Sequence, residues 1–279
     1  MYSICVIRYI AFFSLVLSSV PLHAQNLHSG AEAAGLGFAT VALEGNMAVW
    51  ANAAGLASVR KRQILTGYEN RYGLVDGLHA AQAAYIHPLS KSTLGVSLYR
   101  FGDALYSQHR ISLSAAHQIG QFSAGIRLNQ HQYSMEGGET RFAMAVDVGG
   151  VMRLSSQLKL GMQISNVSQA RVSKQTNERI PSVLSIGLGY RPDQQLKLLA
   201  ELAYQLGKLP TLKVGLDYMP VDFVSLRSGI NSGPNPLFFF GLGLRHSVLH
   251  FDYALETHQV LGMAQHIGLA YHFRANEKR

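Results

Sequence analysis

Serine and histidine residues are the first candidates for chemistry in this 279-residue sequence. Ser112 and Ser114 lie between His109 and His117, and a serine beside a histidine base is the centre of a hydrolytic triad. One extended strand cannot supply a whole triad, and the sequence has no Gly-x-Ser-x-Gly turn. We therefore expect no catalytic residues and no enzyme activity.

Metal, nucleotide and nucleic-acid chemistry receive no support either. The twelve histidines are dispersed. The single cysteine, Cys5, lies in the N-terminal stretch that reads as a signal peptide, so the mature chain would have no cysteine ligand for zinc. No glycine-rich phosphate loop follows a strand and opens a helix. The net charge is +8, but lysine and arginine are spread along the chain without a basic run. We expect no metal, no cofactor and no nucleic-acid partner.

Charged residues of both signs recur on one face of many extended segments. Such a set could line a polar channel or form a catalytic group, or the charges could pair across neighbouring strands inside a barrel. We favour pairing. The residues are Arg127, Arg141, Asp147, Lys159, Lys197, Glu201, Lys213, Asp217, Arg227, Arg245, Asp252 and Glu256.

The elements that must position these charges are strands with one apolar face. The chain is 48% hydrophobic and only 14% charged, and apolar residues alternate with others, as in QHIGLAYHF at 265–273. The segments match the roughly 9–11 residues of a tilted strand that crosses a bilayer. This predicts an all-β fold, a closed antiparallel transmembrane β-barrel of about 14 strands within residues 62–273. The expected strands are 62–69, 78–88, 92–101, 105–118, 121–133, 139–153, 158–167, 181–191, 195–206, 210–219, 222–231, 237–246, 248–257 and 265–273.

The ends and connections of the chain predict its location. Residues 1–24 read as a signal peptide, with Arg8 before the apolar stretch Tyr9–Leu17 and a small-residue cleavage pattern ending at Ala24. Connections are short after even-numbered strands and longer after odd-numbered ones, which is typical of bacterial outer-membrane barrels with both termini in the periplasm. We expect contact with outer-membrane lipid and lipopolysaccharide, and a C-terminal tail at 274–279.

Residues 25–61 do not follow the strand pattern. They are rich in alanine and glycine and contain the only tryptophan, Trp50. Two interpretations stay open: a lead-in that covers the periplasmic mouth of the barrel, or a hatch-like plug inside the lumen. An unfilled barrel of this size would hold water.

This N-terminal segment carries a recognisable motif, GA-x-AAGLG-x-A-x-VAL-E followed by W-x-N-x-AGLA, at residues 30–57. It resembles the N-terminal signature of PorV/PorQ-type outer-membrane proteins of Bacteroidetes, which are relatives of the FadL fatty-acid transporter barrel. The family usually reads Asn-Pro-Ala-Gly-Leu where this chain has Asn52-Ala53-Ala54-Gly55-Leu56. The candidate hatch residues are Trp50, Asn52, Gly55 and Leu56.

The resemblance implies two functions. PorV-like members are accessory subunits of type IX protein secretion, and they dock on a large translocon barrel or recognise secreted cargo. FadL-like members transport small hydrophobic molecules. We favour the first function and keep the second as the alternative. Neither requires catalytic residues.

Two places carry candidate contacts for these functions. The loop 168–180 could bind a partner or simply face solvent or lipopolysaccharide; its charged residues are Arg171, Lys174, Glu178 and Arg179. On the strand 237–246, Phe239 and Arg245 are predicted to face the lumen. Phe239 could line a ligand path or pack against the N-terminal segment, and we favour packing.

Overall fold

The computed structural model describes residues 30–71, 79–173, 178–233, 235–258 and 262–274. The expected signal peptide, Lys174 and the tail after Arg274 lie outside the described residues. Among the described helices, none is both long and apolar enough to cross a membrane.

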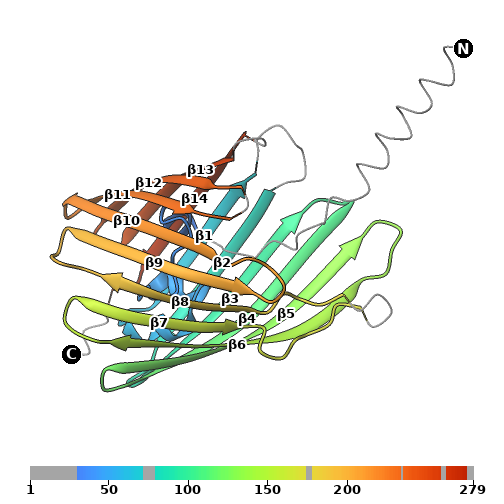
Figure 1. Cartoon of the computed structure of the whole chain (residues 1–279), viewed down its shortest axis with the longest axis horizontal. Helices are drawn as coiled ribbons and strands as arrows, with labels where there is room; N and C mark the ends of the chain where they lie inside the picture. The colour runs from blue at the N-terminus through green and yellow to red at the C-terminus, as the bar shows by residue number, and fades with distance from the viewer. Residues whose placement is uncertain (1–29, 72–78, 174–177, 234, 259–261, 275–279) are drawn as a thin grey trace, which may run out of the picture.

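Fourteen strands form one closed antiparallel barrel, so the predicted fold class is confirmed (Figure 1). No boundary differs from the expected one by more than three residues, the largest shift being the start of the last strand. The strands are β1 (Gln63–Asn70), β2 (His79–Pro88), β3 (Ser92–Gly102), β4 (Tyr106–Ile119), β5 (Phe122–Met135), β6 (Arg141–Arg153), β7 (Leu158–Ser165), β8 (Val183–Tyr190), β9 (Leu196–Gln205), β10 (Thr211–Val221), β11 (Val224–Asn231), β12 (Leu237–His246), β13 (Leu249–His258) and β14 (Gly262–His272).

The barrel closes between β1 and β14, which pair from Gln63↔His272 to Asn70↔Gln265. Closure matters because lipid offers no hydrogen bonds to an open sheet edge, so every strand needs a partner on both sides. The alternation in the last strand therefore has a clear purpose. Ile267, Leu269 and Tyr271 are exposed on the outer surface, while His266 and Ala270 are buried on the inner one.

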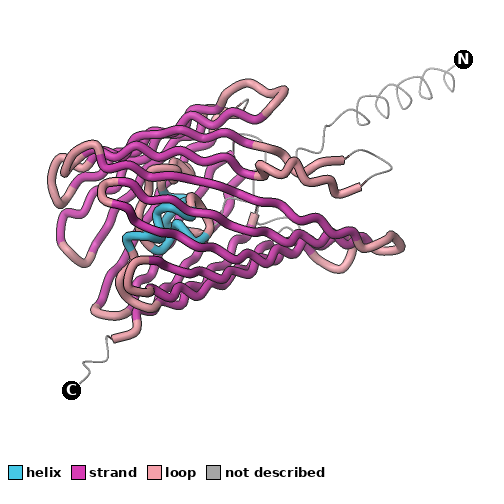
Figure 2. Tube along the Cα trace, turned by 90° about the horizontal axis from the view of Figure 1, so that it is seen from below, coloured by secondary structure: helices cyan, strands magenta, loops and turns pink. Residues whose placement is uncertain are grey.

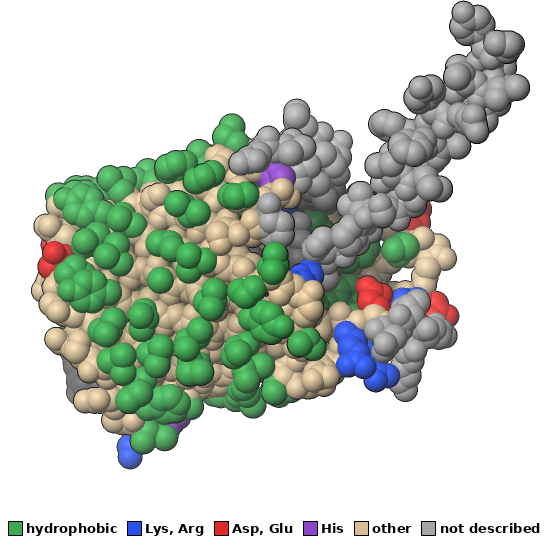
Figure 3. Space-filling model, in the orientation of Figure 1, with side chains coloured by type: hydrophobic (Ala, Val, Ile, Leu, Met, Phe, Trp, Pro, Cys, Tyr) green, Lys and Arg blue, Asp and Glu red, His purple; other side chains and the backbone are tan. Residues whose placement is uncertain are grey.

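The same alternation covers the outside of the barrel with apolar side chains. Leu113 on β4 is 54% exposed and Phe142 on β6 is 59% exposed, whereas their inward neighbours Ser112 and Ala143 are buried. Figure 3 shows hydrophobic side chains distributed over the strand surface, with the charged ones in this view gathered towards the ends. This is the surface of a barrel whose solvent is lipid.

The two ends of the barrel differ. At the end that we call the turn end, even-numbered strands are joined to the next by short turns, such as Gly120–Gln121, and both ends of the barrel sequence lie there. At the opposite end, the loop end, the longest connection joins β7 to β8 over residues 166–182.

Residues 30–59, the plug, lie inside the lumen nearer the turn end (Figures 1 and 2). Three short helices form within this segment: α2 (Ala31–Gly35), η1 (Asn46–Val49) and η2 (Ala53–Ser58). The side chains of Leu36, Val49 and Leu56 are completely buried. Of the two interpretations of this segment, the structure shows the one inside the lumen.

Inward-facing glycines make room for the plug. A Cβ atom on Gly125 would lie 2.2 Å from the nitrogen of Ala54, and one on Gly229 would lie 2.2 Å from the nitrogen of Gly37. Real Cβ atoms do not approach backbone that closely, so only glycine lets the plug backbone touch the wall. This glycine ring comprises Gly95, Gly125, Gly149, Gly161, Gly187, Gly215, Gly229, Gly241 and Gly268.

Candidate functional site

A cavity of about 460 Å³ occupies the lumen on the loop-end side of the plug. This volume lies in the usual range for pockets that hold small molecules. The plug supplies its floor, strands β4 to β10 supply much of its wall, and the loop 166–182 contributes at the loop end. Its lining includes Phe38, Val41, Trp50, Phe101, Tyr106, Arg110, Arg127, Tyr133, Ala145, Asp147, Val172, Glu178, Arg179, Ile180, Glu201 and Lys213.

Aromatic rings from the plug form part of the floor. Phe38 packs edge-on against Phe239 of β12, with ring centroids 5.5 Å apart, and also contacts the His266 ring at 6.0 Å. Trp50 is 5% exposed, and its indole nitrogen has no hydrogen-bond partner within the described structure. These rings give the floor an apolar surface towards the cavity.

Asn52 joins the plug to the barrel wall. Its side-chain oxygen accepts a hydrogen bond from the Ala54 nitrogen, which caps η2, while Nδ2 lies 2.7–3.2 Å from the carbonyl oxygens of Val41, Gly150 and Met162. The structure also shows where Ala53 stands, the position at which the resembled motif has proline. Ala53 is the first residue of η2, a position where proline is favoured but not required.

Glu201 on β9 holds the plug from another side. Its carboxylate accepts hydrogen bonds from the backbone nitrogens of Thr40 and Val41 at 2.8 and 2.9 Å, and from Lys213 Nζ on β10 at 2.9 Å. Both charged side chains are only 4% exposed. A buried carboxylate is tolerable because these donors replace its hydration.

A second ion pair links the plug to the loop end. Arg127 on β5 donates to Asp147 on β6 at 3.0 Å and to the carbonyl oxygen of Val49 at 3.2 Å. Asp147 also accepts from Asn129 Nδ2 and from the Asn166 nitrogen, each at 2.8 Å. The predicted pairing of luminal charges across neighbouring strands is therefore seen in the structure.

Asn166 shapes the loop that follows β7. The residue has a positive φ of 51°, its Nδ2 donates to the Ile180 carbonyl at 2.7 Å, and its Oδ1 accepts from the Ala170 nitrogen at 2.9 Å. Asparagine tolerates this backbone conformation better than most residues. The loop is thereby folded back, so that Val172 and Ile180 reach the cavity.

The barrel wall is incomplete beside this loop. β6 pairs with β5 along its length, from Arg141 to Met152, but pairs with β7 only from Val148 to Arg153. Further towards the loop end, the Val146 carbonyl accepts instead from the Val167 nitrogen at 2.8 Å. At Val146, the edge of β6 is thus bonded to the loop residues Val167 and Ser168 and not to β7.

Arginine side chains stack on aromatic rings near the loop end. The Arg71 guanidinium lies 5.1 Å from the Phe101 ring centre, and the Arg110 guanidinium lies 5.3 Å from that of Tyr99. Arg71 also pairs with Glu69. Cation–π contacts of this kind hold the flat guanidinium groups against the wall.

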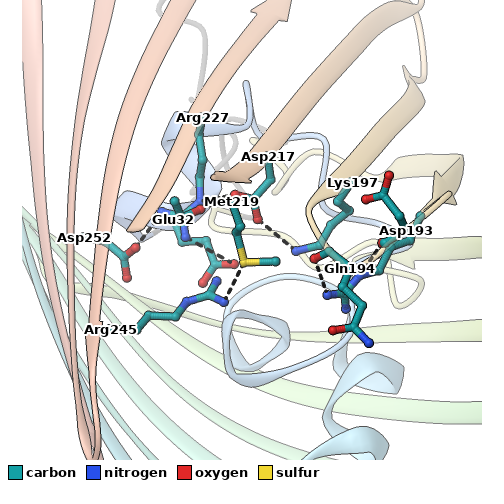
Figure 4. A network of polar contacts seen from close by, with 11 residues as sticks. Glu32, Asp193, Gln194, Lys197, Asp217, Met219, Arg227, Arg245 and Asp252 are labelled. Carbon is teal, nitrogen blue, oxygen red and sulfur yellow. Dashed lines mark hydrogen bonds and ion pairs between the residues drawn. The ribbon is translucent and has the colours of Figure 1, made fainter. Parts of the chain in front are cut away.

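A further polar network fixes α2 at the turn-end side (Figure 4). Arg227 on β11 donates to Asp252 at 2.5 Å and lies 3.5 Å from Asp217 and 3.9 Å from Glu32 of α2. Lys197 on β9 joins this network because its Nζ donates to Asp217 at 3.1 Å. Four strands are thus connected to the plug helix through ion pairs between two cations and three carboxylates.

The residues predicted as contact sites fall in different places. Glu178 and Arg179 line the cavity, Glu178 lies 3.8 Å from Arg141, and Arg171 is exposed. Phe239 packs against the plug as expected and is completely buried. Arg245 faces the lumen near the turn end, where it donates to Met219 Sδ at 3.2 Å (Figure 4).

The serine and histidine residues of β4 do not come together. Ser112 and Ser114 are buried on the inner face, whereas His109 and His117, at odd positions, lie on the outer face of the same strand. Ser112 Oγ donates to Asn129 Oδ1 at 2.7 Å. Within the described ranges, no group of three or more His, Cys, Asp or Glu residues could hold a metal ion.

Two features of the site were not found by sequence reasoning. Asn166 was not among the predicted site residues, although its side chain bonds to Ile180 and Ala170 and so shapes the loop after β7. The glycine ring was also missed. Its signal was available, because glycines recur at inward positions of strands whose other inward residues are large or polar.

Comparison with known proteins supports the fold. No family model and no curated protein matches the sequence. The Pseudomonas putida toluene transporter TodX is 12% identical over 88% of this chain and 97% of its own, with a TM-score of 0.66. A TodX deltaS2S3 mutant, described as a monoaromatic hydrocarbon channel, gives a TM-score of 0.69, with 13% identity over 88% of this chain and 98% of its own.

A Pseudomonas aeruginosa FadL homologue is likewise similar, with 13% identity, coverage of 88% of this chain and 98% of its own, and a TM-score of 0.61. The chain therefore has the fold of FadL-family outer-membrane barrels. The comparisons give no support to the expected PorV/PorQ membership, which is carried by the N-terminal motif alone.

Proposed function

We propose that this protein is a FadL-like channel of the outer membrane that takes small hydrophobic molecules into the lumen. The single observation that carries the proposal is the cavity of about 460 Å³ between the plug and the loop 166–182. Two of the similar structures are described as a toluene transporter and a monoaromatic hydrocarbon channel, which supports the same class of ligand. A FadL-like transporter is the alternative that the sequence analysis kept open, and it now replaces secretion as the function that we favour.

The charged cavity wall is compatible with hydrophobic ligands. Lys213 and Arg127 are held at 2.9 Å from Glu201 and Asp147, so these charges are neutralised within the wall. What remains for contact includes the rings of Phe38, Phe101 and Tyr133 and the apolar loop residues. A small hydrophobic molecule, and especially an aromatic one, matches this surface.

The route into and out of the cavity follows from the wall. We propose that ligands enter from the loop end and that the β6 edge, bonded at Val146 to loop residues in place of β7, offers a lateral way through the barrel. In this orientation the loop end faces outward and the turn end faces the periplasm. The plug prevents the lumen from acting as an open pore.

The residues of the motif that suggested a secretion subunit pack inside the barrel. A Cβ atom on Gly55 would lie 2.3 Å from the Leu43 carbonyl oxygen, and Gly35 and Gly37 contact the wall directly. Asn52 and Leu56 are likewise buried within the plug and its contacts. Packing of the plug therefore accounts for these residue types without a translocon or cargo partner.

Uptake of hydrophobic compounds tests the proposal. The full chain is expressed in a bacterial host that lacks its own outer-membrane channels for such compounds, and uptake of radiolabelled toluene and of a long-chain fatty acid is measured. We expect uptake well above that of the empty host, reduced by the cavity-filling variant Ala145→Phe. The matched control is Ala200→Phe, at an outward-facing position of β9.

Uptake no greater than that of the empty host, with the barrel correctly folded in the membrane, would contradict a channel function. Uptake that Ala145→Phe leaves unchanged would contradict the role of the cavity.

A further inference from the structure

Positive charge is concentrated on one sector of the turn end. Between β14 and β5, the exposed residues of this end include five cations: Arg60, Lys61, Arg62, Lys91 and Arg274. Among the described residues at the ends of these strands, at 59–63, 88–93, 118–123 and 272–274, there is no carboxylate. We call these five residues the basic rim.

The rest of the turn end is different. On the opposite sector, Arg191 is accompanied by Asp193 and Asp222. Between the two sectors, Arg153 and Lys159 are both paired with Glu44 of the plug, at 3.0 and 2.5 Å. The basic rim is thus a local surplus of positive charge and not a property of the whole end.

The basic rim lies at the edge of the apolar outer surface. Leu89 is 50% exposed and comes two residues before Lys91, Ile119 is 65% exposed in the neighbouring turn region, and Phe273 is followed directly by Arg274. The Phe273 nitrogen also donates to the Arg62 carbonyl at 2.9 Å, which holds these two ends side by side. In a membrane, this level is where lipid headgroups lie.

Part of the rim has the chemistry of a phosphate site. An open hollow between the β2–β3 and β4–β5 turns is lined by Arg60, Ser90, Lys91, Gln118 and Gly120. Arg60 is held in place, because its Nη1 donates to the Ala57 carbonyl at 2.7 Å and its Nη2 to Gln118 Oε1 at 3.1 Å. A guanidinium, an ammonium and a hydroxyl group are the usual partners of phosphate oxygens.

We propose that the basic rim binds the headgroup phosphate of anionic phospholipid in the leaflet at the turn end. A lipid fits better than an acidic protein, because the cations border the exposed apolar residues that acyl chains would cover. The site is separate from the cavity on the other side of the plug, so the proposal does not depend on the transported ligand.

Native mass spectrometry of the full barrel tests this proposal. The protein is titrated in micelles with phosphatidylglycerol or phosphatidylcholine, and retained lipid is counted. We expect retention of phosphatidylglycerol over phosphatidylcholine. Each positive charge near a headgroup contributes about a fivefold change in binding. The variant Arg62→Gln/Lys91→Gln/Arg274→Gln should therefore weaken phosphatidylglycerol binding by more than tenfold.

The matched control removes the same charge at other exposed positions, in Arg100→Gln/Arg171→Gln/Lys208→Gln. We expect it to bind phosphatidylglycerol as the wild type does. Equal binding of the two lipids by the wild type would overturn the proposal, and so would an equal loss in the rim and control variants. Both variants are first shown to migrate as folded barrels, and Arg60→Gln alone gives a second, smaller test of the hollow.

Discussion

The two halves of the lumen are filled in different ways. In the turn-end half, the wall carries small inward residues, and the plug backbone packs directly on glycines such as Gly125 and Gly229. In the loop-end half, the wall carries long polar and aromatic side chains, such as Arg110 and Tyr133, and these surround a cavity. One strand supplies both surfaces: β5 has Gly125 near the turn end and Tyr133 near the loop end.

This difference explains how a barrel can be closed and still hold a ligand. Packing of backbone against backbone leaves no room for water or solute, whereas side chains on a curved wall leave a space in the middle. The boundary between the halves is marked by Glu201 and Arg127, which contact the plug backbone from the wall.

Loss of the buried carboxylate at this boundary should have the largest effect on stability. Glu201→Ala leaves Lys213 and two plug nitrogens without their shared acceptor, and removing one member of a buried ion pair costs about 3–5 kcal/mol. Urea unfolding in detergent should show this loss. The double variant Glu201→Ala/Lys213→Met should recover part of it, and an unchanged midpoint for Glu201→Ala would contradict the role of this pair.

The second prediction concerns the glycines on which the plug packs: a side chain at one of them should displace the plug. In Gly229→Val, the new side chain meets the plug backbone at Gly37, and overpacking of this kind costs about 1–3 kcal/mol. Displacement of the plug should raise single-channel conductance in planar bilayers severalfold. Gly138→Val is the control, because a Cβ there meets ordinary contacts at 3.4 Å or more. Equal conductance in both variants would show that the glycine ring does not seat the plug.

Asn52→Ala should loosen the plug without altering the wall. The substitution removes the η2 cap and the contacts with three carbonyl groups, at a cost of about 2–3 kcal/mol. The rate of backbone hydrogen exchange should increase in residues 46–58. It should stay unchanged in the parts of the strands that lie in the loop-end half of the barrel. Asn231→Ala serves as control, since the Asn231 side chain accepts a local hydrogen bond from the Gly233 nitrogen at 3.3 Å and lies outside the plug.

The smallest effect is expected at the loop-end surface. Arg141 and Glu178 are 3.8 Å apart and their side chains are 37% and 61% exposed, so the pair contributes about 0–1 kcal/mol. Arg141→Ala should leave thermal unfolding nearly unchanged at moderate salt. A loss comparable with that of Glu201→Ala would mean that the loop is held far more firmly than its exposure indicates.

The barrel was predictable from sequence because its alternation has a single physical cause. Each strand must face lipid on one side, so the apolar character of residues such as Leu113 and Phe142 indicates that they point outward. The luminal charges were predictable for a related reason, since Lys213 and Glu201 lie on adjacent strands and face the same way. These are local or nearest-neighbour properties.

The site was less predictable because it depends on contacts that are distant in sequence. Asn52 meets the carbonyls of Gly150 and Met162, and Glu201 meets the plug more than 150 residues away. The inward glycines become a signal only when several strands are compared, and no local pattern indicates that Asn166 folds a loop over a cavity. The resemblance of the N-terminal motif drew attention to the segment that forms the plug, but it led us to favour secretion as the function.

Fluorescence of Trp50 tests the central claim most directly, because it is the only tryptophan and it lines the cavity. The purified barrel is titrated with a brominated monoaromatic hydrocarbon, which quenches indole emission at close range. Binding in the cavity predicts saturable quenching in the wild type, weakened at least tenfold in Ala145→Phe and retained in Ala200→Phe. Quenching that does not saturate, or that is equal in the two variants, would contradict a hydrophobic ligand site inside the barrel.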